Sequence, residues 1–395
     1  MAQQEAFIVA VARTAGAKRN GRLSGWHPAD LAGQVLDALV TRSGIDPAAI
    51  DDVVMGCVGQ AGQQAANVAR GAILSSLLPE SVPGTTVDRQ CGSSQQALHF
   101  AAQAVMSGAM DAVIAAGVES MSRVPMGTPI LLPAKNGMGD YISEGMQRRY
   151  PGVEFSQFSG AEHLAEKYGL SREALDDYAY ASHLRAIAAS RDGAFKQEIV
   201  PVAARSAEGG DLGEWHEVDE GIRFNVTREG FAEVKLIQEH NGRVTAASAS
   251  QICDGASGVL VVNERGLKAL GVKPLARIHH MSVIGHDPVI MLEAPIPATQ
   301  RALQRAGLSI QDIDLFEVNE AFASVPLAWQ KVLEADPARL NVHGGAIALG
   351  HPLGASGTKL MSTLVQALQR RGARYGLQTM CEGGGLANVT IIERL

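Results

Sequence analysis

The chain has few residues of several kinds. Of its 395 residues only four are cysteine, 5% are aromatic and 19% are charged. Cys57, Cys91, Cys253 and Cys381 lie far apart and form no C-x-x-C pair, so the sequence predicts neither a zinc site nor a disulfide framework. A reduced, cytoplasmic protein fits this cysteine usage best. Cys57 follows a strand-like core segment and Cys253 has no glycine-rich surroundings, so both are interpreted as structural.

The chain also lacks an excess of basic residues and a long apolar run. Its 34 Lys and Arg against 41 Asp and Glu give a net charge of −7, which argues against nucleic-acid and membrane partners. The apolar run at 6–12 follows Glu5 with no basic segment before it, and we interpret it as a strand rather than a signal peptide. The uncharged stretch 91–110 contains Gln95, Gln96 and His99, which suits a buried helix better than a membrane span.

Several cofactor motifs are missing as well. The chain has no G-x-x-x-x-G-K-[ST], no G-x-G-x-x-G after a strand and no H-E-x-x-H. A nucleoside triphosphatase, a nicotinamide enzyme and a zinc hydrolase are therefore unsupported. We expect no metal and no tightly bound cofactor.

What the chain does have is glycine, 43 residues of it, and an internal repeat. Residues 44–54 match residues 307–317, and an apolar helical pattern at 97–105 recurs at 360–368 with the same offset. Strands alternate with helices in each copy. The pattern predicts two α/β halves, each with helices on both faces of its sheet, related by a pseudo-twofold axis.

A third match breaks the offset and locates an insertion. The strand at 259–262 resembles the strand at 389–392, only 130 positions later, so the first half is interrupted between about 119 and 250. Long excursions of this kind often cover a functional site. We predict an N-terminal half made of 1–118 plus 251–274, an inserted loop or lid domain at 119–250, and a C-terminal half at 275–395.

Cys91 is the first candidate for chemistry. It lies between a strand ending near Asp88 and a helix that begins with Gly92, and a thiol at a helix N-terminus faces free N–H groups and the positive end of the dipole. Both would favour the nucleophilic thiolate. The alternative is a small buried hydrophobe, the usual role of free cysteine. The glycine and two serines that follow favour a nucleophile, because they leave room for a substrate.

His351 lies in a glycine-rich loop, 341–357, near the position that the repeat makes equivalent to Cys91. A pseudo-twofold axis would bring the two turns face to face, and a histidine beside a thiol is the pairing that nucleophilic catalysis requires. A purely structural hydrogen-bonding histidine is the alternative.

Two further positions follow strands. Cys381 opens a glycine turn, where a second thiol can donate and accept a proton and the N–H of Gly383 can bind an oxyanion. Asn319 follows the strand at 315–318, at the strand end where α/β proteins bind ligands. A cap for the following helix is the simpler interpretation of Asn319.

Four motifs resemble one family. They are Asp88–Ser94, Asn319–Ala323, Gly350–Gly357 and Cys381–Gly385. With these motifs in this order and spacing, the chain resembles the thiolases, acyl-CoA:acetyl-CoA C-acyltransferases, along essentially its whole length. The resemblance implies a duplicated five-layer αβαβα fold with an inserted loop domain, assembled as a homodimer or homotetramer.

The resemblance also implies a reaction, the thiolytic cleavage of a 3-ketoacyl-CoA by coenzyme A. Cys91 would attack the keto group while His351 takes the thiol proton, and Cys381 would protonate the departing acetyl-CoA enolate. A water held by Asn319 would stabilise that enolate together with His351, and the N–H groups of Cys91 and Gly383 would stabilise the covalent intermediate. Coenzyme A is then a substrate rather than a bound cofactor. Arg223 and Ser250 align with positions that contact coenzyme A in relatives.

The chain departs from the short-chain pattern. Short-chain biosynthetic relatives carry a His-Met pair just before the helix that contains Ala161 and Glu162, whereas this chain reads Ser-Gln-Phe-Ser-Gly-Ala-Glu at 156–162. This departure resembles the degradative and steroid-side-chain branches, as does the segment 18–25. We therefore expect β-oxidation of a medium, long or bulky acyl-CoA, with biosynthetic condensation of two acetyl-CoA as the alternative. His343 stands where relatives usually have asparagine, and its role is left open.

Two other classes compete with this interpretation. Decarboxylating ketosynthases share the fold and the nucleophilic cysteine, but they use a second histidine near the position of Asn319 or Cys381, and the presence of Cys381 argues against them. A non-catalytic acyl-CoA carrier would lack a catalytic residue, and none is missing here.

Overall fold

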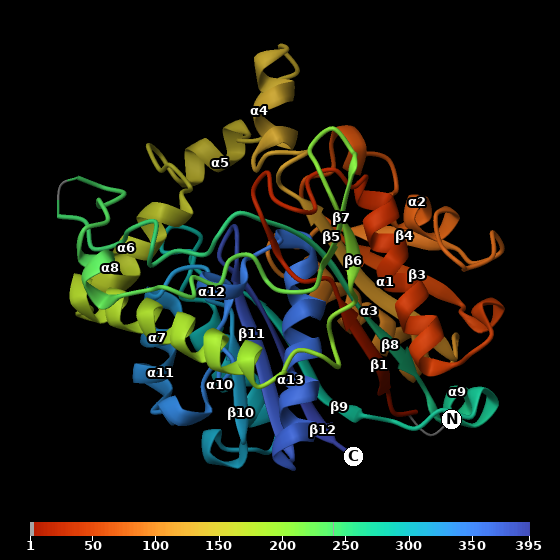
Figure 1. Cartoon of the computed structure of the whole chain (residues 1–395). Coiled ribbons are helices and arrows are strands. Elements are labelled where there is room, and N and C mark those ends of the chain that lie inside the picture. Colours follow the sequence, from red (N-terminus) through yellow and green to blue (C-terminus); the bar gives the residue numbers. More distant parts are fainter. Residues whose placement is uncertain (1–3, 240) are drawn as a thin grey trace.

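The computed structural model describes residues 4–239 and 241–395. One large mixed sheet runs through both halves in the order β10-β11-β12-β9-β1-β8-β5-β3-β4, with the short β2 beside β8 (Figure 1). The strands are β1 (Phe7–Arg13), β2 (Ala17–Lys18), β3 (Asp52–Gly56), β4 (Gly84–Val87), β5 (Ala112–Ser120), β8 (Cys253–Val262), β9 (Ala276–Gly285), β10 (Leu315–Val318), β11 (Tyr375–Glu382) and β12 (Leu386–Arg394).

The strand order confirms the predicted duplication. The run β1-β8-β5-β3 has the same directions as β9-β12-β11-β10: the last pair is parallel in each run and the other pairs are antiparallel. The two runs join where β1 pairs with β9 through Phe7 and Ile8 alone. The counterpart of β4 is reduced to a single bridge between Phe316 and Leu340.

Helices form three layers around the two halves of the sheet. One buried cluster packs β3, β5 and β8 against helices of the N-terminal half, a second packs α3 and α13 against both halves, and a third lies on the outer face of β10–β12. This is the five-layer αβαβα arrangement that the resemblance implies. The helices concerned are α1 (Pro28–Ser43) and α2 (Val68–Leu74), then α3 (Ser93–Ser107) and α13 (Ser356–Arg371), and finally α10 (Pro295–Ala306) and α11 (Ser324–Leu333).

Between β5 and β8 the chain makes a long excursion. Its main helical stretch consists of two helices separated by Gly169, which has a left-handed φ of 60°. Ser156 and Ser171 cap them through their side chains. The elements are α4 (Thr128–Lys135), α5 (Glu144–Arg149), α6 (Gln157–Lys167), α7 (Arg172–Arg191), β6 (Val202–Arg205), β7 (Asp211–His216) and α8 (Arg228–Ala232). The predicted division at residues 118, 250 and 274 stays a prediction.

The helices of the excursion lie in two different places. In Figure 1, α4 and α5 project above the edge of the sheet, whereas α6 and α7 lie along the C-terminal half. Two short helices complete the fold, α9 (Glu264–Leu270) and α12 (Ala346–Leu349).

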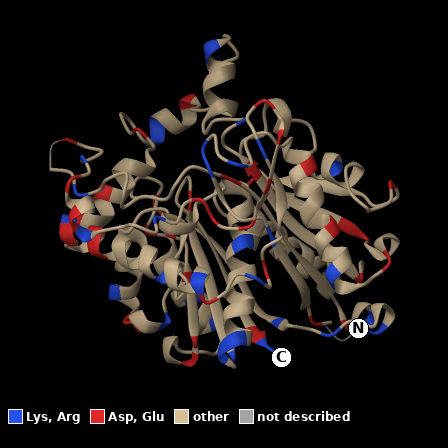
Figure 2. Cartoon of the chain, viewed as in Figure 1, with Lys and Arg blue, Asp and Glu red and all other residues tan. Residues whose placement is uncertain are grey.

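Charged residues lie mainly on helices and loops, with both signs interspersed, and the strands are largely uncharged (Figure 2). Among the described residues, every helix is too short or too polar to cross a membrane.

Candidate active site

The N-termini of α3 and α13 meet, as the repeat predicts. The backbone N–H of Thr358 donates to the Ser94 hydroxyl at 3.0 Å. Any side chain on Gly357 would overlap the backbone of Gln95, so only glycine lets the two helix ends approach this closely. The glycine excess of the Gly350–Gly357 motif therefore has a packing cause, and the turns that carry Cys91 and His351 lie on neighbouring helix ends.

A cavity of about 580 Å³ opens on Cys91. Its wall includes Cys91 and Gly383, and Leu353 of the His351 loop. The rest of the wall is largely apolar and comes from the excursion, including Met121, Val124, Met126, Ile130, Met146, Tyr150, Phe155 and Gln157. Cys91 is partly exposed to this cavity, which argues against the interpretation of Cys91 as a buried hydrophobe.

His351 is buried behind the cavity and is held in one orientation. Its Nδ1 lies 2.5 Å from the Ser356 hydroxyl, and that hydroxyl donates to the carbonyl oxygen of Pro352 at 2.8 Å. Because the serine proton is committed to Pro352, Nδ1 must carry the proton and donate to Ser356. The other nitrogen, Nε2, is therefore the unprotonated one and can act as a base.

Asn319 lies next to that base. Its Nδ2 is 3.4 Å from Nε2 of His351, and its Oδ1 has no hydrogen-bond partner within the described part of the chain. The following helix, α11, begins at Ser324 and is not capped by a side chain, so Asn319 is not its cap. An amide held against the imidazole with a free oxygen is suited to holding a polar ligand or a water there.

The backbone before His351 is fixed by a buried lysine. Lys359 of α13 is 5% exposed, and its Nζ donates to the carbonyl oxygens of Leu349 and Gly350 at 2.6 and 2.9 Å. Gly350 has a left-handed φ of 79° and packs against Cys253, whose sulfur would overlap any side chain there. Cys253 thus has the structural role that the sequence predicts.

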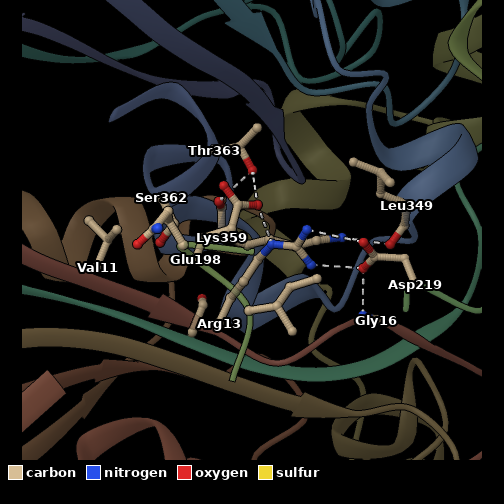
Figure 3. A network of polar contacts seen from close by, with 12 residues as sticks. Val11, Arg13, Gly16, Glu198, Asp219, Leu349, Lys359, Ser362 and Thr363 are labelled. Carbon is tan, nitrogen blue, oxygen red and sulfur yellow. Dashed lines mark hydrogen bonds and ion pairs between the residues drawn. The ribbon is translucent and has the colours of Figure 1, made fainter. Parts of the chain in front are cut away.

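A buried ionic network lies under this lysine (Figure 3). The guanidinium of Arg13, fully buried, donates to Glu198 at 2.6 Å and to both oxygens of Asp219 at 2.8 and 3.0 Å. Thr363 of α13 donates to Glu198, and Asp219 accepts the N–H of Gly16. The network links β1, the inserted excursion and α13, so it fixes the helix that carries Lys359. Removing one partner of such a pair leaves a buried charge without a counter-charge, which typically lowers the free energy of unfolding by about 3–5 kcal/mol.

The two halves are also tied by Glu119. Its buried carboxylate accepts the backbone N–H groups of Val58, Gly59 and Gly354, each at 2.9 Å. Gly354 belongs to the His351 motif and the other two belong to the first half. This carboxylate therefore holds the His351 loop against the wall of the cavity.

Cys381 lies at the end of β11 and is 1% exposed. Burial raises the pKa of its thiol well above the ordinary value, and the neighbouring Cys91 raises it further. Within the described residues, His351 has no hydrogen bond to either thiol.

The resting site is neutral, contrary to the expectation that the helix end would lower the pKa of Cys91. Burial raises the pKa of Cys91 to about 12, the carboxyl of Glu382 adds to this, and the N–H of Cys91 itself offsets only part. Burial lowers the pKa of His351 to about 3, with help from Lys359. Proton transfer between them must therefore accompany attack on a substrate rather than precede it.

The predicted coenzyme A contacts lie apart from these groups. Arg223 is exposed and lines a second hollow of about 400 Å³ with Phe231 and Ala247. Ser250 donates its N–H to the carbonyl oxygen of Ala321, inside the Asn319 motif, and does not line that hollow. His343 packs edge-on against Phe195, with the ring centroids 5.9 Å apart, and Phe195 in turn lies against the guanidinium of Arg13.

Sequence reasoning missed the groups that hold the site in place. Lys359 and Ser356 follow His351 at spacings of eight and five in the sequence, and Glu119 ends β5. Lys359 shares its helix face with Ser356, Ser362 and Thr363, so the sequence pattern gives no sign that its ammonium group is buried. The described residues contain no cluster of His, Cys, Asp and Glu that could hold a metal, and the absence of a cofactor stays a prediction.

Two thiols, an oriented imidazole and an amide at the junction of duplicated α/β halves define an enzyme that works through a nucleophilic cysteine. Known proteins place it in a family. The model of the thiolase N-terminal domain matches residues 6–265, and that of the thiolase C-terminal domain matches residues 272–394. The chain belongs to the thiolase family and is an acyltransferase.

Individual relatives agree with this assignment. The chain is 52% identical over 393 residues to steroid 3-ketoacyl-CoA thiolase FadA6 of Mycobacterium tuberculosis, covering 99% of this chain and 94% of the relative. Human mitochondrial 3-ketoacyl-CoA thiolase, solved in complex with CoA, superposes with a TM-score of 0.88 at 35% identity, covering 100% and 98% of the two chains. The acetyl-CoA acetyltransferase of Bacillus anthracis gives 0.90 at 34% identity, covering 100% and 99%.

Proposed function

We propose that the protein cleaves 3-ketoacyl-CoA with coenzyme A to give acetyl-CoA and a shortened acyl-CoA. The observation that carries the proposal is the placement of Cys91 and Gly383 on the wall of a 580 Å³ cavity, with the His351–Asn319 pair buried behind it. The 52% identity to a steroid 3-ketoacyl-CoA thiolase supports degradation rather than condensation of two acetyl-CoA.

In the first half-reaction, Cys91 passes its proton to Nε2 of His351 as its sulfur attacks the keto carbon. The N–H groups of Cys91 and Gly383 stabilise the resulting oxyanion. The bond between the α and β carbons then breaks, and its electron pair becomes the enolate of acetyl-CoA. Cys381 protonates that enolate and is left as a thiolate, and Asn319 and His351 stabilise the enolate oxygen before protonation.

In the second half-reaction, coenzyme A replaces acetyl-CoA and gives its thiol proton to Cys381. The coenzyme A sulfur attacks the acyl group on Cys91 and expels the Cys91 thiolate, which regains its proton from His351. Every proton is then back where it began. The high pKa of both thiols fits this scheme, because each thiol holds its proton until a substrate is in place.

Coenzyme A would reach the site past Arg223. Arg223 lines the hollow of about 400 Å³ with Phe224, Asn225 and Thr227, in the segment before α8. A guanidinium pairs well with phosphate oxygens, and the apolar part of the hollow suits the rest of the molecule. Ser250 lies at the Asn319 motif and would act through backbone contacts.

The acyl group would be medium, long or bulky. Gln157 lines the cavity and Phe158 packs on Phe322 with ring centroids 5.7 Å apart, so neither residue closes the cavity to acetyl size. The cavity is wider than an acetyl group needs, and its apolar wall comes mostly from the excursion. The 52% identity to a steroid 3-ketoacyl-CoA thiolase supports a steroid-derived acyl group.

The experiment that tests the function follows the absorbance of the 3-ketoacyl-CoA enolate after addition of coenzyme A. The wild-type enzyme should consume the substrate, and Cys91→Ala should not. Activity that survives this substitution would contradict the mechanism. A kcat/KM that is far higher for acetoacetyl-CoA than for longer substrates would contradict the assignment of the acyl group.

We also propose a homodimer or homotetramer in a reducing cytoplasm. β4 is an open edge of the sheet, and the nearby Leu74, Leu77 and Phe100 are exposed large apolar residues. Light scattering coupled to size exclusion tests the oligomer, and a monomer would contradict it. The reaction requires free thiols, and the four cysteines are unpaired.

A further inference from the structure

Glu382 is a buried acid that the mechanism above does not use. It lies on β11 between Cys381 and Gly383, has no solvent exposure, and neither carboxylate oxygen has a hydrogen-bond partner within the described residues. Its carboxyl group lies directly against Gly92, the residue after Cys91, where any side chain would overlap it. The carboxyl is thus packed between the segments that carry both reactive thiols.

Few groups favour a charge on this carboxyl. Arg89, which precedes α3, is the cation that acts on it, but no ion pair joins the two in the described chain. The backbone N–H of Asn388 on β12 also lowers the pKa of Glu382, but no regular hydrogen bond joins the two groups. A charge on Glu382 would in turn raise the pKa of the thiols of Cys91 and Cys381. A buried carboxyl without partners is more stable as the neutral acid.

The protonation state of Glu382 matters for Cys91. Burial raises the pKa of Glu382 to about 8, and a charged Glu382 is the largest contribution after burial to the raised pKa of Cys91. The sign follows directly. Below about pH 8 the carboxyl is mostly neutral and does not oppose a thiolate, whereas above it the carboxylate repels the negative charge that Cys91 must acquire.

On the basis of the proposed function, we propose that Glu382 is a positioning residue that keeps its proton in the working enzyme, so that Cys91 can ionise during attack, and that loss of this proton sets the alkaline limit of acylation. Glu382 touches neither the cavity nor the substrate and acts through Cys91.

The first test measures alkylation of Cys91 by iodoacetamide, which needs no substrate. Wild type is compared with Glu382→Gln from about pH 6 to about pH 10, after subtraction of the rate in the Cys91→Ala background. We expect equal rates near the low end and a Glu382→Gln rate that is greater by about tenfold near the high end, the effect of about one unit in the pKa of Cys91. The exposed Glu217→Gln is the matched control and should follow wild type.

Two results would overturn the proposal. If the alkylation rates of Glu382→Gln and wild type are equal at every pH, Glu382 does not act on Cys91. If the Glu382→Gln rate already exceeds the wild-type rate at low pH, the carboxyl is charged throughout the range. If Glu382→Gln does not fold, Glu382→Asp keeps the acid. Its rate of Cys91 alkylation should then rise less steeply with pH above about pH 8 than below it, as in wild type. A Glu382→Asp rate that rises with the same slope throughout would contradict the proposal.

The second test uses turnover and separates the two proposals. In wild type, kcat/KM for a 3-ketoacyl-CoA should fall above about pH 8, and in Glu382→Gln that fall should move to higher pH. Turnover that falls identically in both variants would contradict the role of Glu382. An enzyme without thiolysis would overturn the proposed function, while the alkylation result would still decide the role of Glu382.

Discussion

Lys359 donates a hydrogen bond of 2.9 Å to the carbonyl oxygen of Gly350, the residue directly before His351. A second bond of 2.6 Å runs to Leu349. One buried ammonium group therefore holds the backbone that leads into His351, and its charge also lowers the pKa of that histidine.

Replacement of this lysine tests the arrangement. Lys359→Met keeps the length of the side chain but removes both bonds and the charge, and we expect kcat to fall about ten- to hundredfold, the equivalent of about 1.5–3 kcal/mol for hydrogen bonds to a charged group. The KM for coenzyme A should change little. Removal of the cation should also raise the pKa of His351, so the acid limb of the rate profile should move to higher pH.

Lys359→Arg is the matched variant, because it keeps a cation in reach of the same carbonyl groups. It should recover most of the lost kcat and leave the acid limb in place. Equal losses in the methionine and arginine variants, with no movement of the acid limb, would show that Lys359 only fills space.

The acyl cavity offers a test with neighbouring residues on α4. Ile130 lines the cavity, whereas the next residue, Leu131, is 67% exposed and does not. Ile130→Trp should lower kcat/KM for long or bulky 3-ketoacyl-CoA by about tenfold or more, because overpacking a filled site typically costs about 1–3 kcal/mol. Acetoacetyl-CoA should be affected less.

Leu131→Trp is the control and should leave the preference for acyl length unchanged. If both tryptophan variants shift the preference equally, or if neither does, the wall of the cavity is not what selects the acyl group. Steady-state kinetics with a series of acyl lengths decides between these outcomes.

Arg223 is tested in the same way against an arginine of α8. Arg223→Gln should raise the KM for coenzyme A by about tenfold with kcat retained, since a lost charge-assisted contact to phosphate is worth about 1.5–3 kcal/mol. Arg228, exposed and paired with Asp177, lies outside the hollow, and Arg228→Gln should not change that KM. An unchanged KM in Arg223→Gln would place coenzyme A elsewhere.

Much of the fold was predictable because the sequence contains two copies of the same α/β pattern. The offset between the segments at 44–54 and 307–317 reveals the duplication, and its break reveals the excursion. The observed strand orders repeat accordingly.

The positions of the candidate residues were predictable from local motifs, and those of the groups that hold them were less so. Cys91, His351, Cys381 and Asn319 belong to local motifs, and the structure places them at adjoining strand and helix ends. Lys359 and Glu119 act through contacts between segments far apart in the chain, which a local pattern does not contain. The expected lowering of the pKa of Cys91 was wrong because burial and Glu382 outweigh the helix end.

The measurement that tests the central claim most directly is the mass of the protein after incubation with a 3-ketoacyl-CoA in the absence of free coenzyme A. The account predicts an added acyl group, shorter than the substrate by the two carbons released as acetyl-CoA, located by peptide mapping on Cys91 and removed when coenzyme A is added. An unmodified Cys91, or an acyl group on another residue, would contradict it.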